Sequence, residues 1–240
     1  MRVLRSILSA AFFLMFGIGG LLFSFVLLFP LSKKSARCIL RMLFRFFVWA
    51  GGKVGLFIVD ISQEDRRRLK SATGSVVVSN HQTLIDAVIL ISLLGDSVCV
   101  TKKAVSRNPF MQVVAKKILV VNDGPLAVVG TANSYLQDGV NVVVFPEGTR
   151  TPADAPNHVF HRGAAHIAIR SGTRVELVNM NCDLKILAKN QPWWDVGDRT
   201  AIYSVRCKGT LDSSAFQNAE QSRKVAAAEL TARMIEGVFG

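Results

Sequence analysis

Apolar and polar residues follow each other along this chain in a pattern that predicts strands and helices in turn. Short runs rich in Val and Ile, bounded by Gly, Asn, Asp or Pro, are typical of buried strands. Longer apolar stretches without such breakers indicate packed helices between them. The expected strands are 56–59, 76–78, 97–100, 118–121, 142–145, 174–180 and 202–206, and the expected helices are 84–94, 109–117, 125–137, 163–170 and 214–237.

This alternation predicts the α/β fold class, with a mixed sheet flanked by helices on both faces. No internal repeat is visible, and no linker separates a second globular domain. A chain of 240 residues is long enough for one such domain and an anchor. We therefore expect a membrane anchor with a basic interfacial helix at 1–52, and one folded domain at 53–240.

The N-terminal segment is the most apolar part of the chain. From Ile7 to Leu31 there are 25 residues without a charged side chain. A helix of that length spans about 37 Å, which exceeds the roughly 30 Å of a hydrocarbon core. It is too long for the core of a signal peptide, and no small-residue cleavage site follows it. The segment therefore predicts a membrane helix, against the alternative of a buried helix in a soluble protein.

The net charge of +12 is concentrated beside this segment. Eight basic residues and no acidic residue precede Asp60, which leaves 21 basic and 17 acidic residues for the rest of the chain. Arg37, Arg41 and Arg45 recur every four residues, which predicts an interfacial helix with a basic face toward anionic headgroups. The basic excess after Leu31 favours a cytoplasmic position for the folded domain. Nucleic acid is not expected as a partner, because the basic residues are embedded in Phe and Leu.

The first candidate chemistry is the pair His81 and Asp86, just after the strand at 76–78. Residues five apart on one ideal helix point about 140° apart. The two side chains can therefore meet only if His81 lies in a turn and Asp86 in the first turn of the next helix. Asp86 would then accept the Nδ1–H of His81 and leave Nε2 free to take a proton. The alternative is that His81 caps the helix and Asp86 favours its positive end.

The second candidate follows the strand at 142–145 and reads Phe-Pro-Glu-Gly-Thr-Arg. Gly148 permits a tight turn, and Arg150 offers a planar fork of donors suited to phosphate. Glu147 could accept from a hydroxyl or orient Arg150, and an ordinary surface turn with a local Glu–Arg pair is the alternative. Two polar clusters at strand ends indicate a single site at the rim of the sheet.

With NHQTLID at 80–86 and FPEGTR at 145–150, the chain resembles the 1-acyl-sn-glycerol-3-phosphate acyltransferase, or lysophospholipid acyltransferase, family. The resemblance extends over residues 54–208. It implies a glycerolipid acyltransferase-like fold at 53–240 and a membrane-associated O-acyltransferase. It also implies that His81 deprotonates an acceptor hydroxyl, that Asp86 orients His81, and that no metal or other cofactor is needed. Acyl-CoA or acyl carrier protein would donate the acyl group. The residues expected to bind the acceptor are Glu147, Gly148, Thr149, Arg150, Lys103 and Arg162.

The chain departs from the family pattern in its second motif. The family usually closes this motif with Asp-Arg, whereas this chain has Asn122 and Asp123. A carboxylate in place of a guanidinium disfavours a phosphate monoester. The usual acceptor, 1-acyl-sn-glycerol-3-phosphate, is thereby less secure than a related acceptor. The Asn-Asp ending resembles acyltransferases of aryl polyene lipid pathways, which makes a polyene lipid precursor an alternative acceptor.

Two other classes of function remain as alternatives. A catalytically silent lipid-binding protein would not need the His81–Asp86 pair. A hydrolase of lipid thioesters would need a Ser or Cys nucleophile near His81, and no nucleophile-elbow motif is present. We expect the inner (cytoplasmic) membrane as location and membrane lipids as partners. Family members can also hold such a helix pair in one leaflet, so the sequence leaves open whether the anchor spans the membrane.

Overall fold

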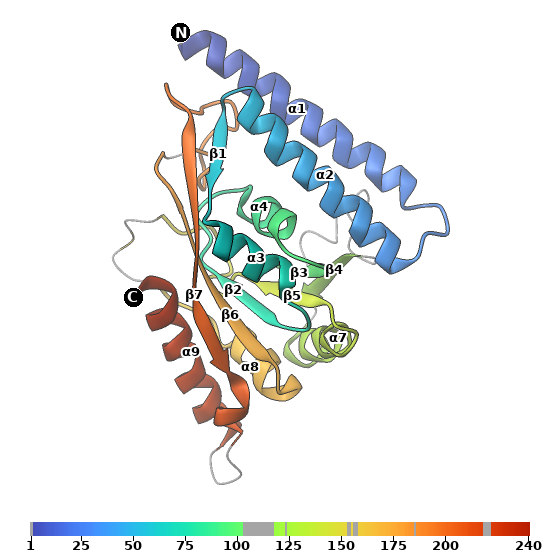
Figure 1. Cartoon of the computed structure of the whole chain (residues 1–240), viewed down its shortest axis with the longest axis vertical. Coiled ribbons are helices and arrows are strands. Elements are labelled where there is room, and N and C mark those ends of the chain that lie inside the picture. Colours follow the sequence, from blue (N-terminus) through green and yellow to red (C-terminus); the bar gives the residue numbers. More distant parts are fainter. Residues whose placement is uncertain are drawn as a thin grey trace.

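The computed structural model describes residues 2–102, 118–122, 124–152, 155, 158–184, 186–217 and 222–240. Helices and strands follow each other along the described chain (Figure 1). In order they are α1 (Arg2–Val26), α2 (Lys33–Lys53), β1 (Phe57–Asp60), α3 (Gln63–Ser71), β2 (Val76–Ser79), α4 (Asp86–Leu93), β3 (Ser97–Lys102), β4 (Leu119–Asn122), α7 (Pro125–Gln137), β5 (Asn141–Val144), α8 (Gly163–Ser171), β6 (Arg174–Cys182), β7 (Ala201–Asp212), a 3₁₀ turn (Ser213–Phe216) and α9 (Arg223–Phe239).

The strands form one mixed sheet in the order β1-β7-β6-β2-β5-β3-β4. The strands β6, β2, β5, β3 and β4 are parallel, β7 is antiparallel to β6, and β1 is parallel to β7. All four residues of β2 and of β5 are buried. Helices cover both faces of this part of the sheet, which explains why these strands are continuous Val runs without polar alternation.

Helices cover the two faces of the sheet as separate layers. One core cluster joins α2 and α4 to the sheet and includes Phe47, Ile89 and Leu90. The other cluster joins α7, α8 and α9 to the opposite face and includes Ala132 and Leu230. The expected α/β class, with a mixed sheet between helices, is confirmed.

All seven expected strands are present; six agree within two residues at each end, and β7 continues six residues beyond its expected end. The expected helices at 84–94, 125–137 and 163–170 are also present, and the one at 214–237 is split between the 3₁₀ turn and α9. The expected helix at 109–117 lies outside the described residues. Helix α3 was not expected, because Leu69 is its only buried residue and no apolar stripe marks it. A Ser62 cap and the Arg68–Glu176 ion pair, at 2.9 Å, hold it instead.

The expectation that Arg37, Arg41 and Arg45 together face lipid headgroups is wrong. Arg37 is buried and makes two hydrogen bonds to the Asp96 carboxylate, at 2.7 and 2.8 Å. The Nε of Arg45 donates to the Ser92 carbonyl at 2.9 Å. Two of these arginines therefore point toward the protein, where their partners are Ser92 in α4 and Asp96 just after it. The exposed residues of α2 include large apolar side chains, namely Met42, Leu43, Phe46 and Trp49.

Helix α1 lies beside α2 as an outer layer (Figure 1). Its length and composition suit a membrane span, and most of its surface is exposed. Both of its ends nevertheless contact the rest of the protein. The Arg5 guanidinium donates to the Gly55 and Arg199 carbonyls at 3.2 and 2.8 Å, and near the other end Phe23 packs in a cluster with Ala36 and Ile118. The helix therefore runs along the protein instead of projecting from it.

Candidate active site

The segment that contains His81 leaves the carboxyl end of β2 and leads into α4. Helix α4 begins at Asp86, so the turn-and-helix placement expected for this pair is the one observed. The Asn80 amide donates to the Met180 carbonyl at 2.7 Å, and the Met180 N–H donates back to Asn80 at 2.8 Å. The Gln82 side-chain oxygen accepts from the Cys182 N–H at 3.1 Å. These bonds fix the turn to β6 and leave little freedom for the side chain between them.

His81 is oriented by a buried carboxylate. Its Nδ1 lies 3.0 Å from Oδ2 of Asp86, whose side chain is 2% exposed. The same Oδ2 accepts the backbone N–H groups of Gln82 and Thr83, at 2.6 and 2.8 Å. The Thr83 hydroxyl donates to Oδ1 and accepts from the Tyr203 hydroxyl at 3.1 Å. Four donors therefore support the carboxylate, which places a proton on Nδ1 of His81.

The opposite edge of the imidazole is available for chemistry. The ring stacks on Phe145, with centroids 4.5 Å apart, and the side chain is 20% exposed. Within the described part of the chain, Nε2 has no hydrogen-bond partner. A neutral imidazole in this orientation can accept a proton from a hydroxyl that approaches Nε2.

The Phe-Pro-Glu-Gly-Thr-Arg segment begins at the carboxyl end of β5, which pairs with β2 in parallel. Gly148 has a φ of +64°, and a Cβ at this position would lie 3.3 Å from the His161 ring. The turn therefore needs glycine, as its sequence predicts. The Thr151 N–H donates to the His81 carbonyl at 2.7 Å. The two predicted clusters consequently meet at one rim of the sheet.

Glu147 is the most unusual residue of this rim. Its side chain is 2% exposed, and within the described residues neither carboxylate oxygen has a hydrogen-bond partner. The Nδ1 of His158 lies 3.6 Å from one of them and is also without a hydrogen bond. Burial raises the pKa of the Glu147 carboxyl, against opposing effects from Thr151, His158 and His81. A desolvated acid therefore sits close to the imidazole that would carry the proton.

Arg150 does not pair with Glu147, so neither the orienting contact considered for Glu147 nor the local pair of the surface-turn alternative is observed. Its Nη1 instead donates to the Leu187 and Ala188 carbonyls, at 2.8 and 3.0 Å. The Leu187 carbonyl also accepts the N–H of Leu84, at 3.1 Å. The segment continues to Trp193, whose carbonyl accepts a hydrogen bond from Ser9 of α1 at 3.3 Å. Arg150 thus fixes the loop that joins the site to α1.

The remaining predicted site residues are exposed or lie outside the described part of the chain. Thr149 and Arg162 are exposed, and Arg162 precedes the first turn of α8. Lys103 and Asp123 lie outside the described residues. The sequence interpretation missed the supporting roles of Thr83 and Tyr203. Thr83 lies between His81 and Asp86 in the motif, so its contact with Asp86 could have been predicted. Tyr203 is distant in sequence, and no motif around it indicates a role at this site.

The fold and this rim define an α/β protein in which a carboxylate orients a histidine at the carboxyl end of a parallel strand. The comparisons with known proteins refine this class. The acyltransferase family model matches residues 60–183, more than half of the chain, so the chain belongs to the acyltransferase family and is an acyltransferase enzyme. A solved structure, the 1-acyl-sn-glycerophosphate (LPA) acyltransferase PlsC from Thermotoga maritima, is similar over 98% of this chain and 97% of that chain. Its TM-score is 0.67 and its sequence identity is 20%. A search of curated proteins finds no match.

Proposed function

We propose that the protein transfers a fatty acyl group from a thioester to a lysophospholipid-type hydroxyl at a membrane surface. The observation that carries this proposal is the His81 imidazole, which Asp86 orients so that Nε2 is left open. Among the described residues, no Ser or Cys side chain is hydrogen-bonded to His81. This arrangement favours direct transfer between two substrates over a covalent acyl-enzyme.

The proposed reaction has one proton carrier. Nε2 of His81 takes the proton from the acceptor hydroxyl while the hydroxyl oxygen bonds to the thioester carbonyl carbon. The tetrahedral intermediate then collapses, the carbon–sulfur bond breaks, and the thiolate leaves. The imidazolium returns the proton to this sulfur, so the products are an ester and a free thiol. The donor would be acyl-CoA or acyl carrier protein.

Two carboxylates support the imidazolium in this proposal. Asp86 contacts Nδ1 directly, and Glu147 acts electrostatically from its buried position near His81. The N–H groups of Gln82 and Thr83 already donate to Asp86. They are therefore not free to stabilise the oxyanion of the intermediate, and other donors at the rim must do so.

The cations at the rim support a polar or phosphorylated acceptor. Arg150 uses Nη1 for the loop, and in the described residues its Nη2 and Nε have no hydrogen-bond partner. Arg162 is exposed beside the same turn, because the N–H of its neighbour His161 donates to the Pro146 carbonyl at 2.8 Å. The proposed acceptor is 1-acyl-sn-glycerol-3-phosphate or a related, less anionic molecule. A polyene lipid precursor remains the alternative within the same reaction.

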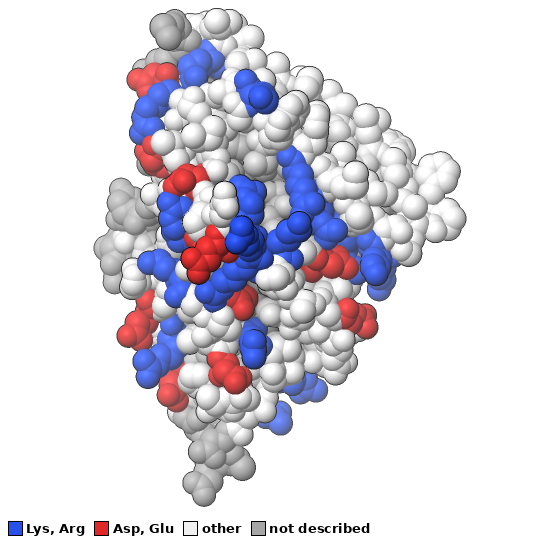
Figure 2. Space-filling view, viewed as in Figure 1, with Lys and Arg blue, Asp and Glu red and all other residues white. Residues whose placement is uncertain are grey.

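The α1–α2 pair supports membrane association. Their exposed surfaces carry large apolar side chains, which include Met15, Leu22 and Phe25 on α1 and Phe46 on α2. In Figure 2 the outer edge along α1 shows almost no charge, and basic side chains gather beside it. Because both ends of α1 contact the protein, we propose that the pair lies in one leaflet, on the cytoplasmic side of the inner membrane.

A direct test is to identify the product. Purified protein would be incubated with an isotope-labelled acyl-CoA or acyl carrier protein and a panel of lysophospholipid and glycerol-based acceptors, and the lipids analysed by mass spectrometry. We expect a labelled ester with one thiol released per ester. Thiol release without any ester would identify a hydrolase. Neither product with any donor would leave a silent lipid-binding protein.

A further inference from the structure

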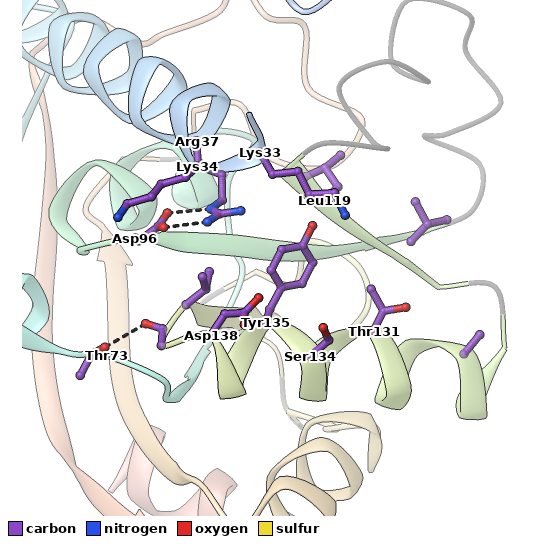
Figure 3. Close-up of a pocket in the computed structure, with 14 residues that line it drawn as sticks. Lys33, Lys34, Arg37, Thr73, Asp96, Leu119, Thr131, Ser134, Tyr135 and Asp138 are labelled. Atoms are coloured by element: carbon purple, nitrogen blue, oxygen red, sulfur yellow. Dashed lines mark hydrogen bonds and ion pairs between the residues drawn. The ribbon is translucent and has the colours of Figure 1, made fainter. Parts of the chain in front are cut away.

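A polar cavity lies at the end of the sheet opposite His81. It has a volume of about 860 Å³ and lies between the start of α2 and α7 (Figure 3). Its floor includes Thr73 and Gly139, which precede β2 and β5, whereas His81 follows β2. Strands rise about 3.3 Å per residue, so the floor lies roughly 20 Å from the imidazole. We call this space the α2–α7 cavity, and it is separate from the candidate active site.

Unpaired donors gather at one end of the α2–α7 cavity. Lys33 and the Tyr135 hydroxyl point toward each other, and the Thr131 and Ser134 hydroxyls lie along α7 on the same side (Figure 3). Lys33 lies 5.9 Å from the centre of the Tyr135 ring and makes no ion pair within the described residues. Lys33 is also the first residue of α2, where the helix end favours an anion.

Tyr135 supplies a further hydrogen-bond donor at this end of the cavity. Its side chain is 8% exposed, and among the described residues its hydroxyl has no hydrogen-bond partner. Burial raises the pKa of Tyr135, Arg37 opposes this effect, and the nearby carboxylates of Asp138 and Asp96 add to it. The hydroxyl therefore keeps its proton at neutral pH and is a donor. The hydroxyl opens into the cavity, where a ligand with an acceptor atom can take its hydrogen bond.

The acidic residues of the cavity do not cancel this donor group. Asp96 is occupied by two hydrogen bonds from Arg37. Asp138 lies with Asp96 toward the other end of the cavity (Figure 3). Lys34 extends toward the Asp96 end (Figure 3), and Lys33 is the cation at the Tyr135 end; in the described part of the cavity neither makes an ion pair. The ligand that fits this end is an anion that accepts several hydrogen bonds, which describes a phosphate group.

The position of the cavity indicates where the phosphate comes from. Leu28 and Phe29, in the turn between α1 and α2, are 65% and 68% exposed, and Lys33 follows them closely. If this turn enters the bilayer, as the proposed function has it, Lys33 lies at the depth of the headgroups. We propose that the α2–α7 cavity binds the phosphate headgroup of an anionic membrane phospholipid that is not a substrate. The bound lipid would fix the depth and orientation of the enzyme on the membrane.

The test compares single substitutions in vesicle co-sedimentation. Vesicles of phosphatidylcholine would be compared with vesicles of equal parts phosphatidylcholine and phosphatidylglycerol. Wild type should prefer the anionic vesicles. Tyr135→Phe, which leaves net charge unchanged, should lose about tenfold of this preference, the loss expected for one hydrogen bond to an anion. Lys33→Ala should lose about fivefold. Lys224→Ala removes an equal charge at the start of α9 and should change nothing.

The possible results separate this inference from the proposed function. The inference would be overturned if Tyr135→Phe preferred anionic vesicles as strongly as wild type does. It would also be overturned if wild type bound both kinds of vesicle equally. Saturable binding of inorganic phosphate that Tyr135→Phe abolishes, with no headgroup preference in vesicles, would make free phosphate the ligand. Failure to bind either vesicle would refute membrane association itself. Acyl transfer to detergent-dispersed acceptor should remain at the wild-type rate in Tyr135→Phe and Lys33→Ala.

Discussion

Replacing Asp86 by Asn separates the charge of this residue from its geometry. Oδ2 receives three donors, whereas Oδ1 receives only the Thr83 hydroxyl. The amide oxygen of Asn must therefore occupy the Oδ2 position, because an NH₂ group there would face three other donors. The NH₂ group then occupies the Oδ1 position, where the Thr83 hydroxyl can accept from it and donate to the Tyr203 oxygen. We consequently expect the fold and the orientation of His81 to survive.

The loss in Asp86→Asn is then a loss of charge beside the imidazolium. We expect kcat to fall by about 10²–10⁴-fold, or roughly 3–5 kcal/mol in the activation barrier, with the KM of the acyl donor almost unchanged. Tyr203→Phe is the matched control. It removes the outer hydrogen bond to Thr83 and keeps the charge, so it should cost about fivefold at most.

The assay is steady-state thiol release, with ester formation confirmed by mass spectrometry and folding by circular dichroism. A kcat for Asp86→Asn within about tenfold of wild type would refute the role given to its charge. An equal loss in Tyr203→Phe would show that the geometry of the network matters more than the charge.

Three further predictions address the buried acid, the loop and the membrane surface. Burial raises the pKa of Glu147 in the folded state, so the ionised side chain destabilises the fold. This loss of folding stability grows as pH rises above the ordinary pKa of a glutamate. Glu147→Gln should therefore raise the Tm more at neutral than at acidic pH while it slows transfer, and an equal gain at both pH values would contradict this account. Arg150→Ala should raise the acceptor KM and also loosen the loop at Leu187 and Ala188, whereas Arg150→Lys should rescue only part of either effect. Kinetics measure the first effect and limited proteolysis the second. An acceptor KM unchanged in Arg150→Ala would count against contact with the acceptor. Replacing Phe46 and Trp49 by Ser should weaken binding to neutral vesicles by about 3 kcal/mol. Val225→Ser, at an exposed apolar residue of α9, should have no effect. Undiminished co-sedimentation of the double variant would exclude this surface.

Much of the fold could be predicted from local pattern, because the central strands are buried on both faces. Val76–Ser79 and Asn141–Val144 are continuous β-branched runs for this reason. Helix α3 was missed because a solvent-exposed helix with one buried Leu has no apolar periodicity. It is held by a cap and an ion pair to a distant strand, and neither produces a periodic signal.

The site was predictable where its partners are close in sequence. His81 and Asp86 belong to one turn, and Gly148 is required by a positive φ, so both could be identified from spacing and residue type. The partners of Arg150 are two backbone carbonyls, which no side-chain pattern reveals. Arg37 shows the same limit. A row of arginines every four residues suits a headgroup, and it also suits an ion pair with a residue such as Asp96, which lies 59 positions away in the sequence.

The departure at Asp123 remains the main open prediction about specificity. This residue lies outside the described part of the chain. If it belongs to the acceptor site, wild type should be poor with lysophosphatidic acid and Asp123→Arg should improve it. Efficient use of lysophosphatidic acid by wild type, unchanged in the variant, would place Asp123 outside the site.

The central claim is that His81 is the base for direct acyl transfer, and His81→Ala tests it most directly. Ester formation by purified wild type and variant would be followed by mass spectrometry on the acceptor that wild type uses best, with folding and vesicle binding checked in parallel. We predict that His81→Ala folds and binds vesicles normally but forms ester at least about 10²-fold more slowly. Turnover near the wild-type rate would contradict the claim.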